Sequence, residues 1–224
     1  MSRPGPTRCR AADRGEPPHD CADCPRLVGF RQHNRAAEPS WHNAPVASFG
    51  PSDARLLIVG LAPGLKGANR TGRPFTGDYA GELLYETLLD LGFATGTYAA
   101  RSDDGLVLVD CMITNAVRCV PPHNKPTPAE IAACRGFLTQ RIAAMERLRL
   151  LLALGRIAHD STLLALSARR SAHPFAHGAR HAIAPRVVLY DSFHCSRYNT
   201  NTGRLTREMF RSVLSAIRAE LDAS

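Results

Sequence analysis

Four cysteines have the residue type and spacing that a metal centre requires. Cys21 and Cys24 form the pair CADC, while Cys119 and Cys134 stand on either side of a proline-rich stretch and the start of a helical pattern. Four thiolates gathered from such distant segments suit a 4Fe-4S cluster or a structural zinc ion. A zinc ribbon more often shows two CxxC pairs, and unliganded core cysteines are the remaining interpretation.

A glycine-rich turn and the loop that follows it form a second candidate site. The turn at residues 60–64 reads GLAPG, and such a backbone can approach a sugar or phosphate closely, although a tight turn without a ligand uses the same residues. The loop continues with Arg70, Arg73 and Phe75, which offer cations to phosphates and an aromatic face to a stacked base. A plain surface loop explains the glycines but not the aromatic ring.

Two polar side chains stand where predicted strands end. The carboxamide of Asn115 offers both a donor and an acceptor to the Watson–Crick edge of an extruded base, unless it only turns the chain. His194 could stabilise developing negative charge, although a histidine at a strand end is more often a structural hydrogen-bonding group. A nucleophilic role for Cys195 is disfavoured, because neighbouring side chains on a strand end point apart.

The elements that must position these residues are strands alternating with helices. The chain shows β-branched and leucine-rich runs at residues 55–60, 106–116, 148–154 and 186–190, and helical patterns at residues 26–38, 81–93, 131–148, 156–167 and 207–221. A capping box at residues 127–130 marks one helix start. This alternation predicts an α/β/α domain with three layers and a four-stranded parallel sheet, whose site lies at the carboxyl ends of the strands.

Composition limits the class of protein. The 224 residues carry 28 Lys plus Arg against 20 Asp plus Glu, and the resulting charge of +8 favours a polyanionic partner. We expect a basic tail at residues 1–20, one domain over residues 21–224, a monomer, and no membrane segment, which together predict a cytoplasmic protein.

The odd count of 7 cysteines argues against a complete disulfide framework. Residues 167–186 are expected to form a basic surface loop.

Five motifs, in their order along the chain, resemble those of the iron-sulfur uracil-DNA glycosylases, most closely the broad-specificity group called family 5 or type B. They lie at residues 60–64, 67–78, 114–119, 174–179 and 194–206, and the similarity extends from about residue 21 to the C-terminus. The resemblance implies the uracil-DNA glycosylase fold, a 4Fe-4S cluster held by Cys21, Cys24, Cys119 and Cys134, and a double-stranded or single-stranded DNA substrate that contains uracil.

The same resemblance assigns roles to individual residues. It implies that Asn115 reads the flipped base, that Phe75 stacks on it, and that His194 donates a hydrogen bond to its O2 atom. A proline usually follows this histidine in the family, and Cys195 replaces it here. The implied substrate-binding set is Gly60, Ala62, Gly64, Phe75, Asn115 and His194, and the implied DNA contacts are Arg70, Arg73, Arg197 and Tyr198.

Ala62 and Asp78 bear on how water is activated. Ala62 occupies the position where other glycosylase families have an acidic or amide residue, and this favours family 5, with hypoxanthine, xanthine and adducts as further substrates. Asp78 is the candidate that orients water or offsets sugar cation charge, with Asn115 and His194 completing the catalytic set; its alternative role is that of a helix N-cap. Because no lysine lies in a matching motif, apart from Lys66 nearby, we expect a monofunctional hydrolase. The alternative is a non-catalytic iron-sulfur DNA-binding protein.

Overall fold

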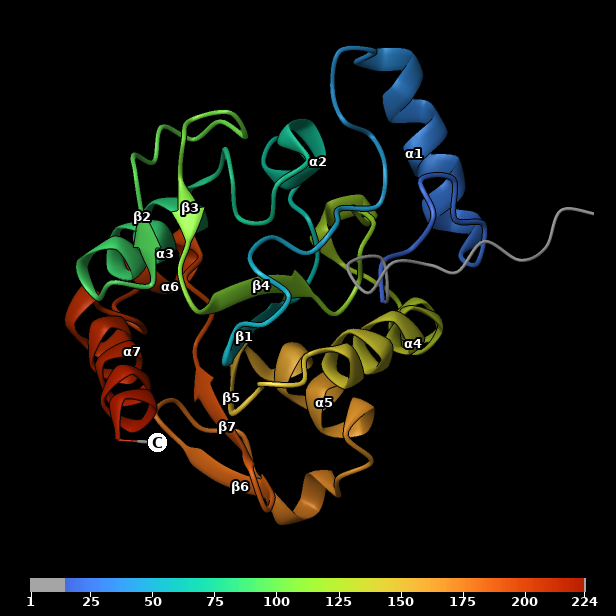
Figure 1. Cartoon of the computed structure of the whole chain (residues 1–224). Coiled ribbons are helices and arrows are strands. Elements are labelled where there is room, and N and C mark those ends of the chain that lie inside the picture. Colours follow the sequence, from blue (N-terminus) through green and yellow to red (C-terminus); the bar gives the residue numbers. More distant parts are fainter. Residues whose placement is uncertain (1–14, 224) are drawn as a thin grey trace, which may run out of the picture.

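The computed structural model describes residues 15–223, and its centre is a twisted sheet in the order β4-β1-β5-β7-β6 (Figure 1). These strands are β4 (Cys111–Asn115), β1 (Leu56–Gly60), β5 (Leu150–Leu154), β7 (Val187–Ser192) and β6 (Arg180–Ala184). The first four run parallel, and every residue of β4, β1 and β5 is buried. Continuous apolar runs of this kind are typical of parallel strands covered on both faces.

Helices cover both faces of this sheet, which confirms the three predicted layers (Figure 1). Helices α3 (Tyr79–Asp90) and α7 (Arg207–Asp222) pack on one face, and α4 (Pro128–Ala144) and α5 (Arg156–Ala165) pack on the other. Alternate residues of β1 enter the two cores: Ile58 lies in the first core, and Leu57 and Val59 lie in the second. The period of two along a strand produces this division.

The remaining elements are short or peripheral. They are α1 (Pro25–Ala37), α2 (Ala68–Thr71), β2 (Ala94–Thr95), β3 (Val107–Leu108), η2 (Pro122–Asn124), η3 (Arg170–Ala172) and α6 (Arg197–Asn201). The predicted capping box is confirmed: Thr127 and Glu130 bond each other's backbone N–H groups at the start of α4.

The sheet has five strands rather than the four that were predicted. The fifth is β6, which lies antiparallel to β7 inside the segment that was expected to be a surface loop. Its residues alternate between exposed and half-buried, with His181 and Ile183 on the inner side. Arg180 of this strand also pairs with Glu220 of α7, so that part of its basic charge is neutralised within the fold.

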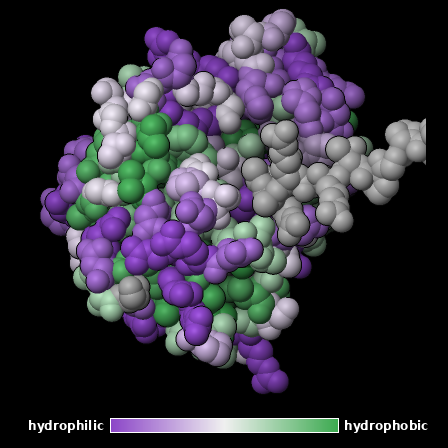
Figure 2. Space-filling model, viewed as in Figure 1, coloured by the Kyte–Doolittle hydropathy of each residue, from purple (hydrophilic) through white to green (hydrophobic). Residues whose placement is uncertain are grey.

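The second predicted strand is divided in two. Its first part, β3, pairs with β2 in a separate two-stranded sheet, and its second part is β4. Asp110 lies between them with φ 54°, and its carboxylate accepts hydrogen bonds from the backbone and side chain of Arg55. This left-handed residue turns the chain from one sheet into the other. Figure 2 shows hydrophobic surface over the β2–β3 sheet, where Val107 and Val109 are exposed.

The tail predicted at residues 1–20 falls mostly outside the described residues, but its end packs on the domain. Glu16 forms ion pairs with the buried side chains of Arg118 and Arg141, and it also accepts the backbone N–H of Ser48. Arg118 additionally donates to the carbonyl oxygen of Gly15. Residues from 15 onward thus belong to the folded domain. Within residues 15–223, the helices are too short or too polar to cross a bilayer.

Candidate active site

A cavity of about 480 Å³ opens at the carboxyl ends of β1 and β4. Its volume lies in the range of small-molecule pockets, and the strand ends are where a ligand is expected in such a sheet. The lining comes from the glycine-rich turn, the start of α3, the end of β4 and the loop after β7: Leu61, Ala62, Pro63, Gly64, Ala68, Phe75, Asp78, Tyr79, Ala80, Asn115, Asn124, His194, Ser196 and Arg197. The structure therefore brings all but Gly60 of the predicted catalytic and substrate-binding residues into the lining of one cavity.

Asn115 ends β4 directly opposite Gly60, the last residue of β1. Its side chain is buried, and its Oδ1 atom has no hydrogen-bond partner in the structure. A Cβ atom on Gly60 would lie 2.4 Å from that oxygen and 2.6 Å from the Cζ atom of Phe75. Only glycine at position 60 leaves the amide and the ring in place. An unsatisfied buried acceptor on a cavity wall is ready to bind a donor from a ligand.

Phe75 contributes an aromatic wall through a strained backbone. Its φ is 52°, in the left-handed region that a bulky residue rarely occupies, and its carbonyl oxygen accepts the hydroxyl of Tyr98 at 3.3 Å. Its ring lies nearly parallel to that of His194, with centroids 5.9 Å apart and an interplanar angle of 28°. Strain of this kind is retained where the surrounding structure fixes it, often at functional sites.

His194 is a neutral imidazole at physiological pH. Desolvation by burial lowers its pKa to about 4, because the charged ring would lose its hydration. Asn199 donates a hydrogen bond to the His194 carbonyl oxygen at 2.8 Å, and the Ser196 hydroxyl caps α6, so the loop is held from two sides. A neutral ring in this position can donate one N–H without carrying charge.

Cys195 points away from the cavity, as the sequence predicted. Its thiol is buried in the core beneath α3 and donates to the carbonyl oxygen of Ala80 at 3.4 Å. Burial also raises the pKa of this thiol. Cys195 is thus a packing residue that fixes the start of the loop after β7.

Asp78 is the N-cap that the sequence allowed, and it also lines the cavity. Its Oδ1 atom accepts the N–H of Gly81 at 3.3 Å, which makes it the N-cap of α3. Its Oδ2 atom faces the end of the glycine-rich turn and the loop after it: a Cβ on Gly64 would lie 2.9 Å from this oxygen, and one on Gly67 would lie only 2.3 Å from it. Burial raises the pKa of this carboxyl, although backbone N–H groups oppose the shift. The carboxylate thus caps α3 and forms part of the cavity wall.

The four cysteines of the expected metal centre line one hollow beside α1. Cys21, Cys24, Cys119 and Cys134 share it with apolar side chains that include Leu27 and Phe137. The backbone N–H of Arg118 donates to the Cys134 Sγ atom at 3.3 Å. Ala62 packs against the same apolar cluster, which places this hollow next to the glycine-rich turn.

Arg31 of α1 also lines the hollow and is 4% exposed. Its guanidinium donates to the Cys119 Sγ atom at 3.7 Å and to the Cys21 carbonyl oxygen at 2.9 Å, while its Nε atom has no partner. A buried cation whose bonds go to sulfur and a carbonyl rather than to a carboxylate requires negative charge nearby. Four thiolates around a metal centre supply that charge, so the donor set fits such a group.

The predicted DNA contacts divide into exposed and buried residues. Arg197 lines the cavity with its guanidinium 5.2 Å from the Tyr79 ring centroid, and Tyr198 beside it is 72% exposed. Arg70 is exposed on α2. Arg73 is instead buried: it pairs with Asp104 at 2.8 Å and lies over aromatic rings. It cannot reach a phosphate, so the prediction for Arg73 is corrected.

Asn124 is a polar residue of the cavity wall that sequence reasoning missed. It ends η2, and both Asn124 and His123 have φ of 56°. The stretch VPPHNKP carried a signal for this loop, because prolines fix its flanks and asparagine tolerates left-handed conformations. Nothing in that stretch indicated that it folds back onto the carboxyl end of β1.

Comparison with known proteins identifies the family of the chain. The family model described as the uracil DNA glycosylase superfamily matches residues 47–218. The chain is 47% identical over 200 residues to a type-5 uracil-DNA glycosylase of Thermus thermophilus, covering 87% of this chain and 90% of the relative. It is 41% identical over 208 residues to that of Pyrobaculum aerophilum, covering 91% and 89%. A type-4 enzyme of Pyrobaculum aerophilum is 38% identical over 127 residues, covering 56% of each.

Proposed function

The chain belongs to the uracil-DNA glycosylase superfamily and is similar over most of its length to type-5 enzymes, and on that premise we propose that the cavity receives one base extruded from DNA. The chain is a hydrolase of N-glycosyl bonds, and extrusion is how enzymes of this kind reach a bond inside a duplex. The observation that carries the proposal is the unsatisfied Oδ1 atom of Asn115 on the cavity wall.

Asn115 reads the Watson–Crick edge of the base. Uracil presents an N3–H donor between two carbonyl oxygens, and a carboxamide matches a neighbouring donor and acceptor of this edge. The Oδ1 atom accepts the N3–H group, while the amide nitrogen donates to O4. Phe75 supplies the stacking surface, and the absence of a side chain on Gly60 lets the base approach both groups.

His194 and Asp78 act on the two charges that form as the bond breaks. The base becomes anionic, and a neutral His194 donates its N–H to the O2 atom without losing a proton. The sugar becomes cationic, and the carboxylate of Asp78, which lines the cavity, stabilises it or orients the attacking water. The methyl side chain of Ala62 can neither stabilise the sugar cation nor orient a water molecule. Its small size leaves room in the cavity for hypoxanthine, xanthine or an exocyclic adduct.

The reaction is hydrolysis without a lyase step. A Schiff base requires an amine in the cavity, and the described residues that line it include no lysine. Lys66 is exposed and lies outside this lining. The product is therefore an abasic site with both phosphodiester bonds intact.

A 4Fe-4S cluster held by Cys21, Cys24, Cys119 and Cys134 is part of the proposal. The shared hollow and the uncompensated buried charge of Arg31 support it. When bound, such a cluster joins α1, the end of β4 and α4, and so serves as a structural crosslink. The residues of the base-binding cavity are separate from it.

Arg197 and Tyr198 contact DNA next to the cavity. Arg197 is placed to bind a phosphate beside the extruded nucleotide, and the exposed ring of Tyr198 can fill the gap left in the duplex. A net charge of +8 supports an added, salt-dependent attraction to duplex and single-stranded DNA.

Base release from a uracil-containing oligonucleotide tests the proposal. Protein in excess over a labelled duplex is followed by alkali treatment and a gel, so that one turnover is measured. Asn115→Ala should slow release by roughly 10²–10³-fold, the scale seen when a positioned hydrogen-bonding group is removed. Asn201→Ala, on the exposed side of α6, should match the wild type.

The outcomes separate the function from the role of one residue. If wild-type protein releases no uracil under these conditions, the non-catalytic DNA-binding alternative replaces the proposed enzyme. If Asn115→Ala releases uracil as fast as Asn201→Ala does, the enzyme stands but Asn115 does not read the base.

A further inference from the structure

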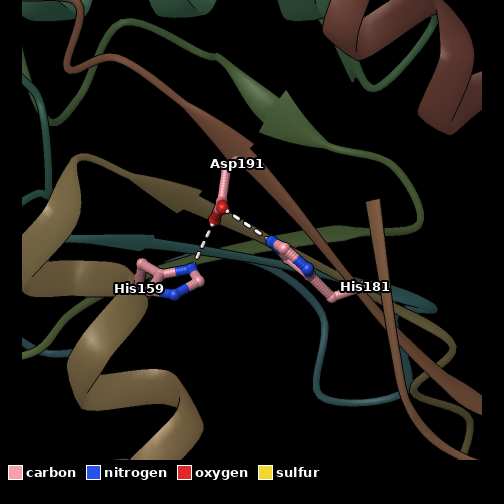
Figure 3. Close-up of side chains that lie close together, drawn as sticks. All are labelled: His159, His181 and Asp191. Atoms are coloured by element: carbon pink, nitrogen blue, oxygen red, sulfur yellow. Dashed lines mark hydrogen bonds and ion pairs between the residues drawn. The ribbon is translucent and has the colours of Figure 1, made fainter. Parts of the chain in front are cut away.

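A cluster outside the cavity and the cysteine hollow combines two histidines and an aspartate from three elements (Figure 3). His159 comes from α5, His181 from the edge strand β6, and Asp191 from β7. The His159 Nδ1 atom lies 2.7 Å from one carboxylate oxygen of Asp191, and the His181 Nε2 atom lies 3.0 Å from the other. All the potential ligand atoms lie within 4.8 Å of one another.

The cluster is built into the protein rather than exposed on its surface. The side chains of Asp191 and His159 are 0% and 1% exposed, and that of His181 is 10% exposed. Buried polar groups of this density require full hydrogen bonding or a bound ion. His181 lies on the edge strand of the sheet, so it provides the route by which an ion could enter.

The outer hydrogen bond of His159 sets its tautomer for ligation. Its Nε2 atom lies 2.9 Å from the carbonyl oxygen of His173, an atom that can only accept. Nε2 must therefore carry a proton, and Nδ1 points into the cluster. Metal-ligating histidines typically donate their second ring N–H to a carbonyl or carboxylate in this way.

We propose that His159, His181 and Asp191 bind one divalent transition-metal ion of the zinc class. Two imidazole nitrogens and one carboxylate form a known zinc donor set, with a fourth position left for water or another side chain. The ring of His173 is 5.5 Å from that of His181 and is the nearest candidate for that position.

The present spacing is close to that of a metal site. Ligands about 2.0–2.2 Å from a tetrahedral ion lie roughly 3.3–3.6 Å apart, so the two hydrogen-bonded pairs need to open by about half an ångström. Rotation of the Asp191 carboxylate and of the less buried His181 ring provides that movement. The ion replaces the proton that now lies between His159 and Asp191, which leaves to solvent. The proton of His181 moves from Nε2 to Nδ1, so that Nε2 can bind the ion.

Binding would join three elements behind the proposed catalytic loop. The ion would tie β6 and α5 to β7, the strand that leads into His194. The site shares no residue with the cysteine hollow, and its nitrogen and oxygen donors differ from thiolates in ligand class. The two centres can therefore be told apart by spectroscopy.

The test uses whole protein purified without oxygen, so that the cysteine site keeps its own metal. After mild chelation, zinc alone is titrated by calorimetry, and cobalt(II) alone is titrated in the visible spectrum. We expect one ion per chain, cobalt bands without sulfur charge transfer, and a Tm rise of roughly 5–10 °C when zinc exceeds its Kd a hundredfold. His181→Gln should weaken zinc binding by about 10²-fold, while the exposed control His33→Gln should bind as the wild type does.

Three results would overturn the proposal. They are the absence of zinc uptake at micromolar concentration by the wild type, unchanged binding in His181→Gln, and cobalt bands with sulfur charge transfer. Zinc uptake by the wild type is measured directly, so the proposal can be refuted even if His181→Gln does not fold. Any of these results leaves a purely hydrogen-bonded histidine–aspartate cluster.

Discussion

Replacing Asp78 by asparagine separates its two roles, because the two carboxylate oxygens face different partners. Oδ1 caps α3 through the N–H of Gly81, while Oδ2 faces the glycine-rich turn and the cavity. Asparagine retains the shape and caps a helix about as well as aspartate does. The substitution removes only the charge and the basicity of the group.

The expected effects on stability and on rate differ in size. Loss of the negative charge at the start of α3 costs about 0.3–1 kcal/mol, because the charge interacts favourably with the helix dipole. This cost is offset because a neutral asparagine avoids the desolvation of a buried charge, the effect that raises the pKa of Asp78. We therefore expect Tm to stay within about 3 °C of the wild type. Loss of a positioned acid–base group slows the chemical step by roughly 10²-fold or more, equivalent to about 2.7 kcal/mol in the barrier.

The pH dependence has a defined sign. Because the folded state raises the pKa of Asp78, the folded protein holds this proton more tightly than the unfolded chain does. Through this group, lowering the pH through the raised pKa favours folding, and Asp78→Asn should abolish that contribution. Catalysis responds in the opposite direction, since the reactive carboxylate is lost over the same interval.

The assay is single-turnover release of uracil from a duplex with enzyme in excess, alongside thermal melting. Glu82→Gln is the matched control, because it removes one exposed charge from the first turn of the same helix and leaves the base cavity untouched. It should retain wild-type rates. Release by Asp78→Asn within threefold of the wild type would refute the reasoning and leave Asp78 as a helix cap only.

The remaining predictions concern charge, the metal centre and pH. Arg197→Ala should reduce the slope of log affinity for undamaged DNA against log salt by about 1, whereas an unchanged slope would remove Arg197 from the phosphate contacts. Arg73→Met should leave that slope unchanged but destabilise the fold by about 3 kcal/mol in denaturant titration, because its partner carboxylate stays buried and unpaired; wild-type stability would contradict this burial. Cys119→Ser should lose iron, sulfide and the brown colour together, and metal analysis that finds zinc in the wild type would exclude the cluster. The rate of base release should fall as the pH drops through the raised pKa of Asp78, and the residual rate of Asp78→Asn should show no step near 6.5, because His194 stays neutral down to about pH 4; a step near 6.5 in Asp78→Asn would show that His194 is solvated.

The sequence predicted the elements that are specified by local pattern. The buried strands β1 and β5 are continuous apolar runs, and the capping box at Thr127 marks the start of α4. The position of Asn115 at the carboxyl end of a strand was also predictable, because a polar residue ends an apolar run there. These features depend on residues within a few positions of one another, so the pattern of the chain contains them.

Strand β6 was missed because its evidence is spread between two elements. Its residues alternate in burial, but the outward positions carry Arg180 and alanines, and the inward positions include a histidine. That composition resembles a basic loop. Its pairing with β7, which follows after only two residues, and the contact of Arg180 with Glu220 on α7, 40 residues away, make it a strand.

The roles of charged residues were decided by tertiary structure alone. Arg73 stands among glycines in a motif that suggested phosphate binding, yet its partner Asp104 lies in a loop 31 residues away that carries no motif. The grouping of His159 and His181 around Asp191 likewise joins three separate elements. Sequence pattern determined which segments fold as strands and helices, because hydrophobic period and capping are local. Only the packed structure decided whether an arginine is exposed or paired with a carboxylate, and which histidines gather around one aspartate. The physical reason is that a polar or charged side chain takes the partner that the fold brings near it.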